Sequence, residues 1–157
     1  MPRDHAYAVA VHWTGNTGSG TSGYRAYRRD HEVRAPGVPT LLGSSDPAFR
    51  GDPSRWNPEQ LFLAAVSQCH MLWYLNLAAS AGVVVLDYVD HASAVMVEES
   101  SGAGQFTSMT LRPEVTITRE EQLSVAETLH HQASSMCFIA RSVNFPVTHH
   151  PTITVGP

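Results

Sequence analysis

The stretch NPEQLFLAAVSQCHMLWYLNLAASAG, residues 57–82, decides the fold. Its opening Asn-Pro pair is typical of a helix start, and Glu59 in the first turn suits the positive end of the helix dipole. Apolar residues then recur at three- and four-residue spacings and place Cys69 on a buried or half-buried face. We therefore predict a long core helix that runs to about Ala81 and stops at Gly82.

Strand patterns precede this helix. Residues 6–13 alternate in hydropathy and predict a strand, residues 15–23 form a Gly- and Ser-rich loop, and residues 24–34 predict a polar second strand. Residues 43–56 are rich in Pro, Gly, Ser and Asp, which predicts a long irregular loop. Loops of this kind often carry functional residues.

Strands and a second helix follow. Residues 83–97 are β-branched and alternating, and residues 105–117 predict their hairpin partner. Thr118, followed three positions later by a glutamate, is a capping-box signature for a second long helix that carries Cys137. Residues 152–155 can add an edge strand. The pattern predicts an α+β fold with an antiparallel sheet.

Length and composition narrow the function. The 157 residues suit one domain over 1–157. The net charge of −4 leaves no excess of positive charge that would bind nucleic acid or anionic lipid. All ten basic residues are arginine, which excludes chemistry by lysine side chains. Because only 15% of residues are charged, we expect an oligomer. The N-terminus lacks a signal-peptide pattern and polar residues interrupt the apolar helix, so we expect a cytoplasmic protein with no membrane span.

The two cysteines are the first candidates for chemistry. Cys69 and Cys137 lie on the apolar faces of the two predicted helices, which can bring the thiols within disulfide range. The alternative is that each is a small buried hydrophobic residue, a common fate of free cysteine. His70 is a poor base for Cys69, because neighbours on a helix point about 100° apart.

A thiolate at neutral pH would need an arginine nearby. Arg50 and Arg55 in the loop before the helix are the obvious donors, and Arg25, Arg28 and Arg29 on the second strand are rivals; each could also be a solvated surface charge.

Glu59 could orient such an arginine, or could only stabilise the helix start. It lies ten residues before Cys69, roughly 15 Å along an unbroken helix. For both to act at one site, either the helix must break after its first turn or Glu59 must come from a second subunit.

Other motifs give little support to other chemistries. The neighbouring pairs at 130–131 and 149–150 are histidines, but paired neighbours diverge and no acid completes a ligand set, so we expect no metal. There is no phosphate-binding loop followed by lysine and no serine-hydrolase elbow.

Two segments resemble a known family. NPEQLFLAAVSQCH, residues 57–70, resembles the helix of the OsmC/Ohr family (osmotically inducible protein C and organic hydroperoxide resistance proteins), in which N-P-E-[EQ]-L precedes a cysteine found ten residues after the Glu. HHQASSMCFIARSVNFPV, residues 130–147, resembles the family's second cysteine segment, although Phe138 stands where the family often has proline. The early Trp-Thr-Gly at 13–15 and Phe-Arg-Gly at 49–51 extend the match.

The resemblance implies an OsmC-like α+β fold, with β-sheets packed on two long core helices, in an intertwined homodimer with its sites at the subunit interface. It also implies a thiol peroxidase that reduces organic hydroperoxides. Cys69 would be the peroxidatic thiolate, Cys137 the resolving thiol, and Arg50 the stabilising guanidinium, held by Glu59. No cofactor is expected, but an external dithiol, a lipoyl protein or a thioredoxin-like protein, must reduce the disulfide.

Two rival functions stay open. A non-catalytic OsmC-like protein could bind a small molecule and keep its thiols protonated. A dithiol–disulfide exchange protein would reduce protein disulfides without consuming peroxide. The apolar surroundings of the cysteines favour a fatty or aromatic hydroperoxide over hydrogen peroxide, since each buried methylene contributes ~0.8 kcal/mol.

Overall fold

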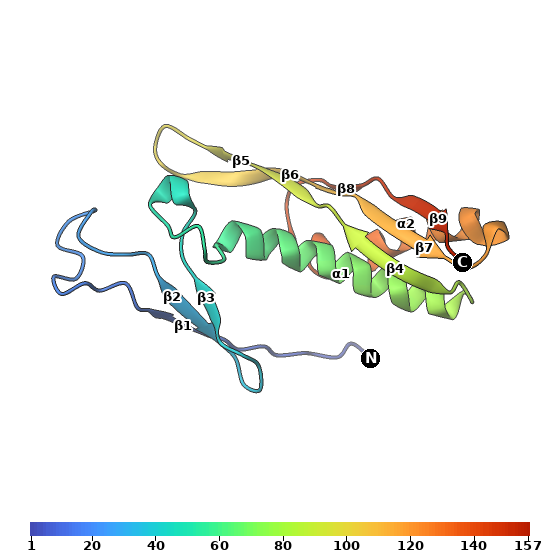
Figure 1. Ribbon diagram of the computed structural model, residues 1–157, viewed down its shortest axis with the longest axis horizontal. Coiled ribbons are helices and arrows are strands. Elements are labelled where there is room, and N and C mark those ends of the chain that lie inside the picture. The colour runs from blue at the N-terminus through green and yellow to red at the C-terminus, as the bar shows by residue number, and fades with distance from the viewer. The chain divides into compact units, whose positions relative to one another are not determined.

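The computed structural model describes all 157 residues, which form two compact units, residues 1–61 and 62–157 (Figure 1). The unit boundary falls within the long helix α1 (Pro58–Ser80). The expectation of one domain over residues 1–157 stays a prediction.

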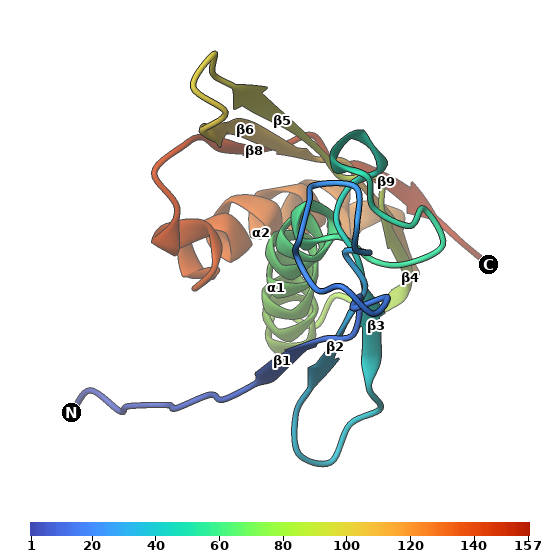
Figure 2. The ribbon, with the colours of Figure 1, turned by 90° about the vertical axis from the view of Figure 1, so that its left-hand side faces the viewer.

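The first unit is built on a three-stranded antiparallel sheet in the order β1-β2-β3 (Figure 2). Its strands are β1 (Ala10–Trp13), β2 (His31–Arg34) and β3 (Leu41–Gly43). The first two are shorter than predicted. Residues 24–30 form turns instead of a strand, because the Arg29 guanidinium donates to the carbonyls of Tyr27 at 2.7 Å and Tyr24 at 2.8 Å and folds the segment upon itself.

The loop over residues 43–56 is irregular, as predicted, and ordered by its own hydrogen bonds. It contains a single 3₁₀ turn, η1 (Pro47–Phe49). The backbone of Ser44 donates to the carbonyl of Trp56 at 2.9 Å and closes the two ends of the loop. Gly51 lies so close to Ser45 that a β-carbon would stand 1.4 Å from the Ser45 carbonyl oxygen.

Helix α1 confirms the prediction made from its ends. Asn57 Oδ1 accepts the Gln60 backbone N–H at 2.8 Å, which satisfies a donor of the first turn. Gly82, with φ of 71°, ends the helix in the left-handed region that glycine tolerates. Length and composition alone would also let α1 cross a bilayer, a property that core helices of soluble proteins share.

The predicted hairpin after α1 exists, but both of its arms are interrupted. The strands are β4 (Val85–Asp90), β5 (Ser93–Glu98), β6 (Gly104–Leu111) and β7 (Pro113–Ile117). β4 pairs with β7 and β5 pairs with β6, so the hairpin contributes to two sheets. At the break, Asp90 Oδ1 accepts the Arg112 backbone N–H at 2.7 Å.

The sheets are mixed, not purely antiparallel as we predicted. The predicted strand β9 (Thr152–Val155) pairs in parallel with β7, and β8 (Val147–His149), which the sequence analysis missed, pairs in parallel with β6. The sheet orders are β4-β7-β9 and β5-β6-β8. The parallel pairing arises because the chain returns to the sheets through a helical segment and not through a tight turn.

The second helix differs from its prediction at both ends. α2 (Leu123–Met136) follows a 3₁₀ turn, η2 (Glu120–Gln122), and no side chain caps either start. The capping box at Thr118 does not form, because the Thr118 backbone N–H donates to the carbonyl of Val84 at 3.2 Å. Cys137 lies at the C-cap with an extended ψ of 110° and not inside the helix, and a short turn, η3 (Ala140–Ser142), follows it.

Two apolar clusters form the core of the second unit. One joins α1, α2 and β7 through Tyr74, Ala78, Val115, Ile117, Ala126, Leu129 and Ala133, with Val85 and Tyr88 of β4 packed against it. The other joins α1 to β6 through Val66, Met109 and Leu111, with phenylalanines 62, 106 and 145 against it. The helices thus pack on the sheets as predicted, and the two cysteines lie on the elements that meet there.

Candidate functional site

The structure brings the two thiols together. Cys69 lies midway along α1 and Cys137 at the C-cap of α2, and Cys69 is near enough to shift the pKa of Cys137. Both are free cysteines. The fold thus brings together two thiols that are 68 positions apart in the sequence.

The two cysteines differ in environment. Cys137 is fully buried, whereas Cys69 is half-buried. Burial, followed by the neighbouring Cys69 side chain, raises the pKa of the Cys137 thiol to about 11. The backbone N–H of Ala140 donates to Cys137 Sγ at 3.4 Å and opposes this shift. Cys137 therefore stays protonated at neutral pH, and its S–H points to the carbonyl of Val66, with Sγ and oxygen 4.0 Å apart.

Aromatic side chains accompany the thiols. Phe138, next to Cys137, is 67% exposed and meets the ring of Trp73 edge to face at 5.6 Å. Phe62 packs against Phe106 at 5.3 Å in the cluster that also contains Val66. The exposed Phe138 and the half-buried Trp73 offer apolar surface of the kind that an organic ligand can cover.

His70 turns away from Cys69, as predicted, and belongs to a buried histidine cluster. Its Nε2 lies 3.0 Å from His130 Nδ1, and the ring of His149 lies 5.5 Å away. Burial lowers the pKa of His70 to about 4 and that of His130 to about 3, with further lowering by the neighbouring histidines. Both rings are therefore neutral at physiological pH.

This cluster was not predicted, although the histidine pairs at 130–131 and 149–150 are evident in the sequence. His149 Nε2 and His131 Nδ1 also lie 3.2 Å apart. Only the fold could reveal that one member of each pair joins His70. No group of three or more His, Cys, Asp or Glu side chains is arranged to hold a metal ion.

The candidate arginines belong to the first unit and differ in how far they are engaged. Arg55 lies 3.9 Å from Asp30 and 3.7 Å from Asp52. Arg29 is bound to carbonyls and stacks on two tyrosine rings. The guanidinium groups of Arg25, Arg28 and Arg50 are exposed and form no ion pair. The pairing of any of them with the thiols stays a prediction.

Glu59 lies in the first turn of α1, and that helix continues unbroken to Ser80. The alternative in which the helix breaks after its first turn is therefore wrong. Glu59 Oε2 is buried and has no hydrogen-bond partner in its own chain. A buried carboxylate oxygen without a donor is costly and calls for a partner from outside the chain.

The fold and the two neighbouring thiols place the chain among two-cysteine α+β proteins. Residues 51–151 match the family described as OsmC-like protein, and the chain belongs to that family. No curated protein matches the sequence.

Solved structures agree with this assignment. An OsmC-like protein of unknown function from Vibrio cholerae is 30% identical with a TM-score of 0.84, over 95% of this chain and 100% of that one. Organic hydroperoxide resistance proteins from Elizabethkingia anophelis and Legionella pneumophila share the fold at 17% and 18% identity, with TM-scores of 0.67 and 0.65. Each comparison covers 98% of this chain and 100% of the other. The predicted family and fold class are confirmed.

Proposed function

We propose that this protein is a thiol peroxidase that reduces organic hydroperoxides. The Cys69 thiolate attacks the terminal peroxide oxygen, the O–O bond breaks, and the alcohol leaves after protonation. Cys69 is then a sulfenic acid. The Cys137 thiol condenses with it, forming the S–S bond and releasing water, and an external dithiol reduces that disulfide and is itself oxidised.

The interaction between the two thiols carries this proposal. Cys137 is buried, protonated and close to Cys69, which suits a resolving thiol that reacts once its partner is oxidised. The half-buried Cys69 is the sulfur with access to a substrate. The hydroperoxide resistance proteins that share the fold support the same class of reaction.

Arg50 is our choice for the guanidinium that keeps Cys69 ionised, because it is exposed, unpaired and presented by an ordered loop. Glu59 would hold that guanidinium by a bidentate pair. Since Glu59 lies on the same unbroken helix as Cys69, roughly 15 Å away, the two act together only if a second copy supplies one of them. The proposal therefore includes a homodimer.

The reaction needs no cofactor besides the thiols. The substrate we propose is a fatty or aromatic hydroperoxide, because the Phe138 and Trp73 rings offer apolar contact. The reductant would be a lipoyl protein or a thioredoxin-like protein, and the place of action the cytoplasm. Nucleic acid and membranes have no part in this proposal.

Stopped-flow kinetics with cumene hydroperoxide would test the assignment. The wild type should turn over with excess dithiol. Cys69→Ser should lose all reaction with peroxide, because no other thiol is accessible. Cys137→Ser should react once and stop as a sulfenic acid, which dimedone traps and mass spectrometry detects.

Two further measurements distinguish the peroxidase from the two alternative functions. Consumption of hydrogen peroxide at the same rate as cumene hydroperoxide would contradict the substrate class. Reduction of a protein disulfide without peroxide consumption would favour dithiol exchange, and no thiol reaction at all would leave a binding protein.

A further inference from the structure

A polar cavity of about 350 Å³ lies wholly within the first unit. It is lined by Arg28, Arg29, Asp30, Arg50, Gly51 and Asp52, so five of its six residues are charged. Its volume is in the range of small-molecule sites. No step of the proposed thiol reaction uses this cavity as a whole.

The carboxylates of the cavity form ion pairs, whereas two of its guanidinium groups form none, and Arg50 only stands 6.0 Å over the ring of Tyr24. Asp30 and Asp52 both pair with Arg55, and Asp30 also accepts from Ser44 Oγ at 3.3 Å. Hydrogen bonds from Ser54 lower the pKa of Asp52, with smaller contributions from Arg55 and Arg28. Arg28 and Arg50 form no ion pair and no side-chain hydrogen bond, so the cavity has positive charge to spare.

The backbone fixes both free arginines. The Arg28 carbonyl accepts from Trp13 Nε1 at 2.9 Å and its N–H donates to the Gly15 carbonyl at 2.9 Å. A β-carbon at Gly15 would stand 1.8 Å from the Arg28 oxygen, so only glycine permits this contact. The segment that carries Arg28 is thus clamped to the end of β1.

Arg50 is held in a more unusual way. With φ of 65° it is the one residue other than glycine in the left-handed region. Its N–H donates to Pro47 at 3.0 Å, and the Gly51 N–H donates to Asp46 at 3.0 Å. A non-glycine residue that keeps a strained conformation often does so because its side chain is used.

We propose that this cavity binds a small oxyanion, a carboxylate or phosphate group, between the guanidinium groups of Arg28 and Arg50. Planar guanidinium forks match such groups through paired N–H donors. The backbone of both arginines is fixed, so the freedom lost on binding is confined to their side chains. The inference rests on the geometry of residues 28–52 and shares only Arg50 with the proposed thiol reaction.

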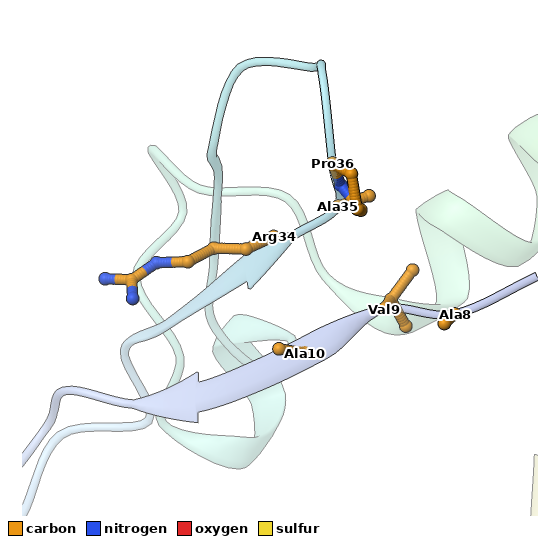
Figure 3. Close-up of a pocket in the computed structure, with 6 residues that line it drawn as sticks. All are labelled: Ala8, Val9, Ala10, Arg34, Ala35 and Pro36. Atoms are coloured by element: carbon orange, nitrogen blue, oxygen red, sulfur yellow. The ribbon is translucent and has the colours of Figure 1, made fainter.

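A second cavity of the first unit lacks the free positive charge that an anion site requires. It measures about 360 Å³ and is lined by Ala8, Val9, Ala10, Arg34, Ala35 and Pro36 (Figure 3). Its one charged residue, Arg34, is paired with Glu32 and extends away from the small apolar side chains around it. That cavity offers no free charge, and we assign it no anion.

Calorimetric titration of the full-length reduced protein would test the proposal, with sodium phosphate and sodium acetate as probes in Tris-chloride buffer at constant ionic strength. Saturable binding of one ion per chain is expected for at least one probe, and comparison of the two distinguishes phosphate from carboxylate recognition. Arg28→Gln and Arg50→Gln should each weaken binding by about tenfold or more, since each removes a charged donor.

Arg25→Gln is the matched control, because Arg25 is an exposed arginine of the same unit outside the cavity. Its affinity should equal that of the wild type. Amide shifts of the wild type on titration should centre on Gly51 and Asp52, a readout that needs no variant to fold. Absence of saturable binding, equal weakening by Arg25→Gln, or shifts centred elsewhere would overturn the proposal.

Discussion

At the scale of single residues, the buried histidines link stability to pH. His70 and His130 are neutral in the fold because burial holds their pKa values at about 4 and about 3, below the ordinary 6.5. An unfolded chain protonates both near pH 6.5. Their contribution to stability is therefore complete above pH 6.5 and is lost as the pH falls from there through about 4 and about 3.

We predict that the free energy of unfolding falls below pH 6.5 by about 1.4 kcal/mol per pH unit for each of these histidines. His130→Phe keeps a ring stacked on Tyr74, 3.9 Å away in the wild type, but removes one titrating group. Urea unfolding of His130→Phe between pH 7 and 5 should show that its free energy of unfolding falls less steeply with decreasing pH than that of the wild type, by the contribution of one proton. An unchanged slope in His130→Phe would contradict the assignment.

At the scale of elements, the start of α1 is set by its cap. Asn57 is 5% exposed, its Oδ1 accepts from the Gln60 N–H at 2.8 Å, and its own N–H donates to Gln60 Oε1 at 3.3 Å. This reciprocal pair orders the first turn, which also carries Glu59.

Asn57→Ala should lower the free energy of unfolding by about 1 kcal/mol, because the N–H of the first turn loses its acceptor. Urea denaturation followed by circular dichroism measures the change. Asn57→Asp retains an acceptor and should lose much less. Equal losses in the two variants would show that the cap is not what stabilises the helix start.

The sequence predicted elements whose determinants are local. α1 has its cap, its proline and its terminal glycine within its own residues, and its bounds were predicted closely. The interruption of the hairpin and the parallel strand β8 depend on contacts between distant segments, so no local pattern announces them. The helical spacing of apolar residues continues past Met136, yet the backbone at Cys137 is extended.

The candidate site also contains some residues that the sequence predicted and others that depend on tertiary packing. Cys69 and Cys137 were singled out by their place on apolar faces, and the structure joins them. The left-handed backbone at Arg50 and the joining of His70 to His130 arise from tertiary packing, which single-sequence spacing does not encode. The roles of Arg50 and Glu59 stay predictions.

At the scale of the whole molecule, much apolar surface stays uncovered in a chain with few charges. Exposed apolar side chains occur in both units: Val11, Trp13, Leu42, Leu72, Val84, Leu86, Val95, Phe138. Burial of such surface against a second copy would remove it from water, and would also give the unpartnered Glu59 Oε2 access to a donor.

We predict that the protein is a dimer at micromolar concentration, with twice the 17.1 kDa mass of one chain by light scattering after size exclusion. Leu72→Glu, at an exposed apolar position of α1, should shift the equilibrium toward the monomer. Gln68→Glu, one turn earlier and exposed, adds the same charge and should not. A wild-type monomer would refute the dimer.

The parallel strands at the end of the chain have a practical consequence for protein engineering. β8 is an edge of one sheet and β9 of the other, and only two residues separate them. Shortening the chain at this end therefore strips an edge from both sheets at once, whereas residues 1–9 precede every strand and are all exposed. Purification tags and fluorescent labels belong at the N-terminal end, where no ladder of backbone hydrogen bonds is disturbed.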